Sequence, residues 1–324
     1  MEKRINKEML YSLCECSSLE KKQFEKLVEE YSCTKVSHWK KFTEYFFLTL
    51  GSGFLLSGIT FFFAYNWNNI PGFWKFGIIL FLLIVSIVIS ISRNIKILVQ
   101  KMSLLGASVL VGVLLAVFGQ EYQTGANAYD LFLVWTIAVF SWTAVSEFTP
   151  QWLFWSVLSN TTLILYFNQV VSGSNISYLF IGLLLLNIFI LILPYMLGKM
   201  QNYIPHSYYR SLMIFVCNFL SVFGVAIWLF SETGNKDIQM NEVTLLLISI
   251  MWIVGSFYAS LKIKNILMFS YFVLTVVSIV LMLLYKVLGD SETSFLIYTL
   301  YVLFGTYGLI KIISHQQRKW SYES

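Results

Sequence analysis

Residues 177–197 have the sequence SYLFIGLLLLNIFILILPYML, with no Lys, Arg, Asp or Glu anywhere in it. A helix rises about 1.5 Å per residue, so a stretch of this length can cross a hydrocarbon layer roughly 30 Å thick. No water is available inside that layer to bind backbone N–H and C=O groups, and a helix satisfies them internally. The stretch therefore predicts a membrane-spanning helix.

Similar stretches recur along most of the chain. The 324 residues are 57% hydrophobic and 12% charged, whereas a soluble domain carries roughly 25% charged residues. The expected spans are 44–65, 75–92, 103–119, 131–146, 151–168, 177–197, 211–231, 243–260, 265–285 and 293–313. The short connection 147–150 predicts an antiparallel hairpin, and a split or merge within 131–168 would change the count. The predicted fold is an all-α polytopic transmembrane helix bundle of about ten spans.

The basic residues give the chain an orientation. If the N-terminus lies inside, all but three of the 22 Lys and Arg residues fall on the cytoplasmic side, the exceptions being Lys75, Lys236 and Lys286. Lys and Arg are enriched in cytoplasmic loops of membrane proteins, so we predict that both termini are cytoplasmic. The formal net charge of +5 is small, and no nucleic-acid partner is expected.

Residues 1–42 form the only soluble-looking segment, followed by a membrane domain at 43–313 and a cytoplasmic tail at 314–324. Ser17 and Glu20 have the spacing of a helix capping box, and apolar residues at 24, 27 and 28 share one helical face. We predict a helical pair too small for a core of its own. It is expected to dock on the membrane domain, on a cytoplasmic protein partner or on a second copy, and the oligomeric state stays open.

The first span is expected to remain in the protein as an internal anchor, because mostly polar sequence precedes it. Cys14, Cys16, Cys33 and His38 do not have the spacing of a zinc site, so no metal ligand is predicted. The spans hold no Ser–His or His–x–x–x–His arrangement, so no catalytic residue and no cofactor are predicted.

Two predicted outer loops concentrate polar and aromatic residues at the membrane boundary. Their candidate binding residues are Asn66, Trp67, Asn68, Gln120, Glu121, Tyr122, Asp130 and Trp135. Amides and carboxylates between aromatic rings could bind a polar head group, a cation or a sugar. In the alternative interpretation, Asn, Gly and Pro form turns and caps while Trp and Tyr anchor the interface.

These loops also carry a family resemblance, over roughly residues 1–165. The motifs are Ala64-Tyr65-Asn66-Trp67, Gly119-Gln120-x-Tyr122 and Leu131-Phe132-Leu133-x-Trp135. They resemble the domain-of-unknown-function family numbered 2157, predicted multi-pass bacterial membrane proteins with a short cytoplasmic helical segment before the first span. Tyr65 departs from the small residue usual at that position. The resemblance implies the bacterial cytoplasmic (inner) membrane and carries no established activity.

Three functional hypotheses follow. The leading one is a non-enzymatic sensor or interaction protein with a polar extracytoplasmic face. The alternative is a transporter or lipid-handling permease for an uncharged or amphipathic substrate, because the spans lack the central charges that ion-coupled carriers use. The weakest is a membrane-embedded enzyme using Glu121 or Asp130 as acid or base. Asn160, Asn187 and Asn218, inside spans, are expected to form interhelical hydrogen bonds.

Overall fold

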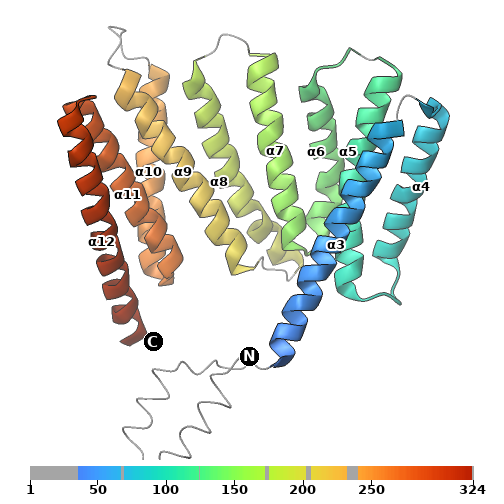
Figure 1. The fold of residues 1–324 in the computed structure, drawn as a ribbon, viewed down its shortest axis with the longest axis horizontal. Helices are drawn as coiled ribbons and strands as arrows, with labels where there is room; N and C mark the ends of the chain where they lie inside the picture. The colour runs from blue at the N-terminus through green and yellow to red at the C-terminus, as the bar shows by residue number, and fades with distance from the viewer. Residues whose placement is uncertain are drawn as a thin grey trace, which may run out of the picture. The chain divides into compact units, whose positions relative to one another are not determined.

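The computed structural model describes residues 36–66, 69–123, 125–171, 175–201, 206–231 and 240–322 (Figure 1). The chain divides into two compact units, Met1–Pro71 and Gly72–Ser324. Residues 1–35 lie outside the described residues, and they include most of the predicted helical pair of residues 1–42.

The described part of the first unit contains the helix α3 (Val36–Asn66). The second unit contains nine described helices. These are α4 (Gly72–Ile91), α5 (Ile97–Glu121), α6 (Ala128–Val145), α7 (Thr149–Gln169), α8 (Ile176–Gln201), α9 (Ser207–Ser231), α10 (Met240–Ile263), α11 (Ile266–Leu288) and α12 (Glu292–Tyr322). The described residues contain no strand, so the predicted all-α fold is confirmed.

Nine of the ten described helices are long and apolar enough to cross a membrane, and α7 is the exception. Its buried residues include Thr149, Gln151, Ser156, Ser159 and Thr162. Because α7 packs against α6 and α8, these side chains meet other helices instead of lipid. The expectation of an apolar stretch at 151–168 was therefore wrong in composition, although a separate helix does form there.

Several helices continue beyond the predicted apolar spans. α3 runs without a break through the expected border between residues 42 and 43, and α12 continues from the expected end of its span to Tyr322. Apolar composition identifies only the part of a helix that can lie in the hydrocarbon layer. The hydrogen-bonded backbone extends into the polar flanks, because nothing there stops it.

Within the second unit, each helix packs mainly on its neighbours in the sequence, and Figure 1 shows α4 to α12 following one another in chain order. α9 also packs on α11, which is not its neighbour in the sequence, in addition to α8 and α10. A cluster of buried apolar side chains joins α6 to α9 and includes Val139, Trp152, Ile190 and Tyr209. The Tyr209 hydroxyl donates to the Ile190 carbonyl over 2.7 Å.

The predicted antiparallel hairpin of α6 and α7 is confirmed by hydrogen bonds along its length. Gln151 Nε2, at the start of α7, lies 3.2 Å from Thr143 Oγ1 near the end of α6. Farther along, the Thr136 and Thr162 hydroxyls lie 3.0 Å apart. Residue numbers rise in one helix as they fall in the other, which is the pattern of antiparallel neighbours.

The contact between α5 and α6 depends on one glycine. Trp135 of α6 donates from its indole Nε1 to the Ser108 carbonyl over 2.7 Å. Its ring then lies directly against Gly112, where a β-carbon would overlap the indole atoms. Close approach of helices over small residues is the usual basis of packing in lipid, where burial from water gives no drive.

We therefore expect Gly112→Ala to lower the free energy of unfolding by about 1–3 kcal/mol, because the added methyl group forces the Trp135 ring away. The measurement is reversible unfolding of the purified protein in detergent. Gly106→Ala, in the same helix with open space around its Cα, is the matched control. Equal stability losses in the two variants would contradict this account of the α5–α6 contact.

Candidate functional site

The ends of α4 and α5 that are predicted to face outward, here called the outer end, carry an ion pair. The Lys75 ammonium lies against the Glu121 carboxylate. Lys75 belongs to the first turn of α4 and Glu121 is the last residue of α5, so antiparallel packing places them together. Only 7% of the Lys75 side chain and 27% of the Glu121 side chain are exposed.

Burial explains why these charges pair. An ammonium group held away from water loses several kcal/mol of hydration, which a nearby carboxylate offsets. Gly72 contributes by leaving space, because a β-carbon there would overlap the Glu121 carboxylate. Lys75 was absent from the predicted site. The sequence did offer an indication of its role, because Lys75 stands in the first turn of an apolar helix and is one of only three basic residues on the predicted outer side.

Two further predicted residues of this loop, Gln120 and Tyr122, flank Glu121 in the sequence. Gln120 is exposed, and the Tyr122 side chain is 65% exposed. The Tyr122 ring centroid lies 4.8 Å from that of Phe118 and 6.0 Å from that of Phe76. The structure thus gathers an amide, a phenol and a paired carboxylate at the outer end of α4 and α5. We call Lys75, Gln120, Glu121 and Tyr122 the outer cluster.

Asp130 has a local structural role. Its Oδ2 accepts from the Asn127 backbone N–H over 3.0 Å, while the Asn127 side chain accepts from the backbone N–H of the third helical residue. This capping box satisfies N–H groups that the start of α6 leaves open. At Asp130 the geometry therefore agrees with the alternative interpretation, in which the polar residues of this loop form turns and helix caps.

Trp135 lies farther along α6, where it packs on Gly112 and donates to Ser108. The start of α6 is also tied to α7, because the Tyr129 backbone N–H donates to Gln169 Oε1 over 2.9 Å. Glu121 thus pairs with a residue of α4, whereas Trp135 packs on α5.

Of the first predicted loop, Trp67 and Asn68 lie outside the described residues, as does the side chain of Asn66. That loop belongs to the first unit and the outer cluster to the second. The joint site of the two loops therefore stays a prediction.

Sequence analysis missed a second polar group, which joins the middle of α5 to the end of α6 and the start of α7. Gln151 is fully buried and donates from Nε2 to Ser108 Oγ over 2.7 Å and to Thr143 Oγ1. Among the described residues, Gln151 Oε1 and the indole Nε1 of Trp152 have no hydrogen-bond partner. The available signal was a glutamine beside Thr149-Pro150 at the start of α7, the one described helix that is not apolar enough to cross a membrane.

The interior asparagines behave as predicted. Asn160 of α7 and Asn187 of α8 exchange amide hydrogen bonds of 3.2 and 2.7 Å. Asn218 Oδ1 of α9 accepts from Trp252 Nε1 over 3.1 Å and from Ser256 Oγ over 3.2 Å, both on α10. Each pair joins neighbouring helices, which confirms the expected interhelical hydrogen bonds.

In the part of the chain that the structure describes, no three His, Cys, Asp or Glu side chains could hold a metal ion together. Cys217 is buried in α9 as a free thiol, while Cys14, Cys16 and Cys33 lie outside the described residues.

Comparison with known proteins supports the sequence resemblance. Residues 12–152 match the family described as "Predicted membrane protein (DUF2157)". No curated protein and no solved structure matches the chain. The family match and the apolar helices together identify a multi-span membrane protein. The matched segment contains α3, α4, α5 and α6, and with them the whole outer cluster.

The ion pair generates a prediction with a definite sign. Glu121→Gln should lower the free energy of unfolding by about 1–3 kcal/mol, because it removes the carboxylate beside a buried ammonium. Lys75→Met should cost less, because the Glu121 carboxylate is more exposed and can turn to water. The double variant should be more stable than Glu121→Gln alone.

Unfolding of the four proteins in the same detergent measures this cycle. Additive effects of the two substitutions, with no recovery in the double variant, would show that the pair does not couple α4 to α5.

Proposed function

We propose that this chain is a non-enzymatic membrane sensor. Its outer cluster binds a polar component of the cell envelope, and its N-terminal segment contacts a cytoplasmic protein. The observation that carries the proposal is the half-buried ion pair of Lys75 and Glu121 beside the exposed side chains of Gln120 and Tyr122.

The arrangement suits binding better than acid–base catalysis. The Glu121 carboxylate is engaged in an ion pair with the Lys75 ammonium, whereas a general base needs its oxygen within hydrogen-bond reach of the proton that it removes. A charged or strongly polar ligand could compete for either member of the pair. Gln120 and Tyr122 would then supply a hydrogen-bonding amide and a ring that stacks on an apolar face of the ligand.

Such a ligand would act on the contact between α4 and α5. A ligand shifts a conformational equilibrium only if it binds the two states with different affinities. A head group, sugar or cation that draws Glu121 away from Lys75 meets this condition, because it weakens one interhelical interaction while forming its own. Each of the two helices is long and apolar enough to cross a membrane, so a tilt at one end would move the other end.

The covalent route to the cytoplasmic side passes through α3. This single helix of 31 residues is about 46 Å long, more than a hydrocarbon layer of roughly 30 Å requires. Its C-terminal end leads through Asn69–Pro71 into α4, and its N-terminal end continues from residues 1–35. One uninterrupted helix, α3, therefore connects the N-terminal segment to the outer loop.

The first test measures binding. Purified full-length protein should gain thermal stability with at least one member of a panel of phospholipid head groups, cell-wall saccharides and divalent cations. Gln120→Ala and Tyr122→Ala should abolish that gain, because each removes a contact of the outer cluster. Tyr178→Ala is the control, an exposed tyrosine near the start of α8. No stabilisation by any member, or equal loss in the control, contradicts the outer-face site.

The second test concerns the cytoplasmic segment. Deleting residues 1–35 leaves α3 whole and should remove the proteins that crosslink to the full chain in cells. An unchanged set of crosslinked partners would end the proposed role of this segment. Substrate flux into vesicles containing the purified protein would favour the transporter or permease alternative instead.

A further inference from the structure

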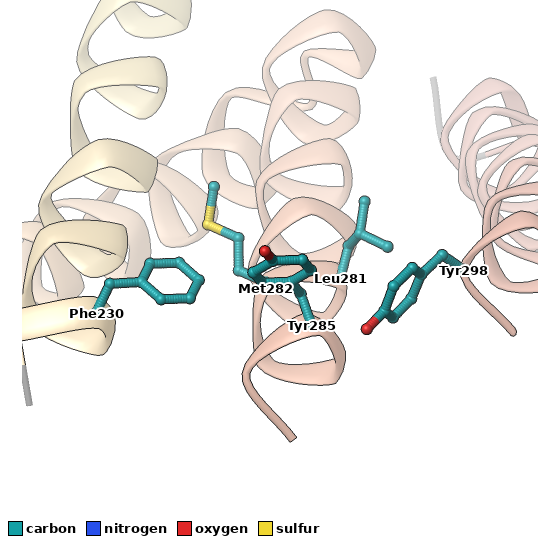
Figure 2. Close-up of a pocket in the computed structure, with 5 residues that line it drawn as sticks. All are labelled: Phe230, Leu281, Met282, Tyr285 and Tyr298. Atoms are coloured by element: carbon teal, nitrogen blue, oxygen red, sulfur yellow. The ribbon is translucent and has the colours of Figure 1, made fainter. Parts of the chain in front are cut away.

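Three helices of the second unit surround a pocket of about 390 Å³ (Figure 2). Its lining residues are Phe230 of α9, Leu281, Met282 and Tyr285 of α11, and Tyr298 of α12. Figure 2 shows Met282 on the side of Phe230 and Leu281 on the side of Tyr298. The Tyr285 ring centroid lies 5.9 Å from that of Phe230 and 6.0 Å from that of Tyr298.

The pocket offers apolar surface at the depth of lipid chains. Leu281 and Tyr285 lie seven and three residues before the end of α11 at Leu288, which places them about 10 and 5 Å below it. The volume is within the roughly 300–1,000 Å³ typical of ligand pockets. A chain of methylene groups fits this lining, whereas a sugar or an ion would lose its hydration without compensation.

Polar groups gather just above the pocket, near the end of α11. The Lys286 ammonium lies 5.9 Å from the centre of the Trp228 ring. The Tyr298 hydroxyl donates to the Gly289 carbonyl over 2.7 Å, and the Tyr285 hydroxyl donates to Asp290 Oδ2 over 3.1 Å. The hydroxyls of both lining tyrosines are therefore engaged at the polar boundary, and their rings line the apolar part.

We propose that this pocket holds one acyl chain of a membrane phospholipid, with the lipid phosphate beside Lys286. Apolar lining below and a cation above reproduce the order of groups in a phospholipid. A lysine ammonium binds phosphate as a point charge, and basic residues at membrane boundaries attract lipid head groups. This site lies outside the family-matched segment 12–152 and is separate from the outer cluster.

The test is photo-crosslinking of the full-length protein in phosphatidylcholine vesicles that contain a trace of phosphatidylglycerol with a diazirine near the middle of one acyl chain. Labelled peptides are mapped by mass spectrometry. Residues 281–298 should be labelled well above other lipid-facing positions, such as the exposed Phe81 and Val88 of α4. Labelling at the same level everywhere would overturn the proposal.

Leu281→Trp should lower labelling of this region by about tenfold or more, because the indole occupies space that several methylene groups would fill. The matched control is Leu283→Trp, on the same helix with 44% of its surface exposed and outside the pocket lining. If Leu281→Trp does not fold, Leu281→Phe is the smaller replacement. Undiminished labelling in the folded variant contradicts an acyl chain in the pocket.

Lys286 distinguishes the head group from the chain. Lys286→Gln should reduce labelling, and Lys286→Arg should restore it, because both Lys and Arg carry the charge that a phosphate needs. Equal labelling in all three proteins would rule out the phosphate contact. In a parallel experiment with a bifunctional protein crosslinker, a crosslink between two copies of the protein at residues 281–298, without a lipid adduct there, would identify a second copy as the occupant and overturn the proposal.

Discussion

The structure depends on one constraint, the lack of water to hydrogen-bond with polar groups inside a membrane. Helices satisfy the backbone internally, and interior side chains must find partners on neighbouring helices. Asn160 and Asn187 meet that requirement between α7 and α8, and the Asn218 side-chain oxygen meets it between α9 and α10 by accepting from Trp252 and Ser256. Each bond contributes only about 0.6–2 kcal/mol, but a mismatched register would leave polar groups unsatisfied at higher cost.

The same constraint explains α7, whose polar composition is unusual for a helix of this chain. α7 packs against α6 and α8, and its buried hydroxyls and amides lie among protein groups. These side chains are therefore stabilised by contacts with other helices and not by lipid. Gln151 joins three helices by reaching Ser108 and Thr143. Close approach of α5 and α6 then requires a residue without a side chain at Gly112, because the Trp135 ring occupies that space.

The candidate site shows how far sequence reasoning reached and why it stopped. Position in the chain and residue type predicted Gln120, Glu121 and Tyr122 at one membrane boundary, and in the structure they lie at the C-terminal end of α5. The same reasoning overlooked Lys75, which is 46 positions from Glu121 and belongs to another apolar helix. It also proposed Asp130 as a ligand residue, whereas the carboxylate accepts from its own helix start. Pattern alone does not distinguish a cap from a binding group, because both use the same side chains at helix ends.

The sequence by itself determined that the chain is helical, that it belongs in a membrane, and where its helices lie. Hydrocarbon thickness and hydration of charge act on each segment separately, so composition along the chain is sufficient for those conclusions. Only the tertiary structure decided which polar group meets which, as in Lys75 with Glu121, Gln151 with Ser108, and the apolar pocket between α9, α11 and α12. Such contacts depend on how each helix is rotated and shifted along its axis relative to its neighbours. Side-chain packing and hydrogen bonding between helices determine that arrangement, so the sequence of one segment alone does not specify it.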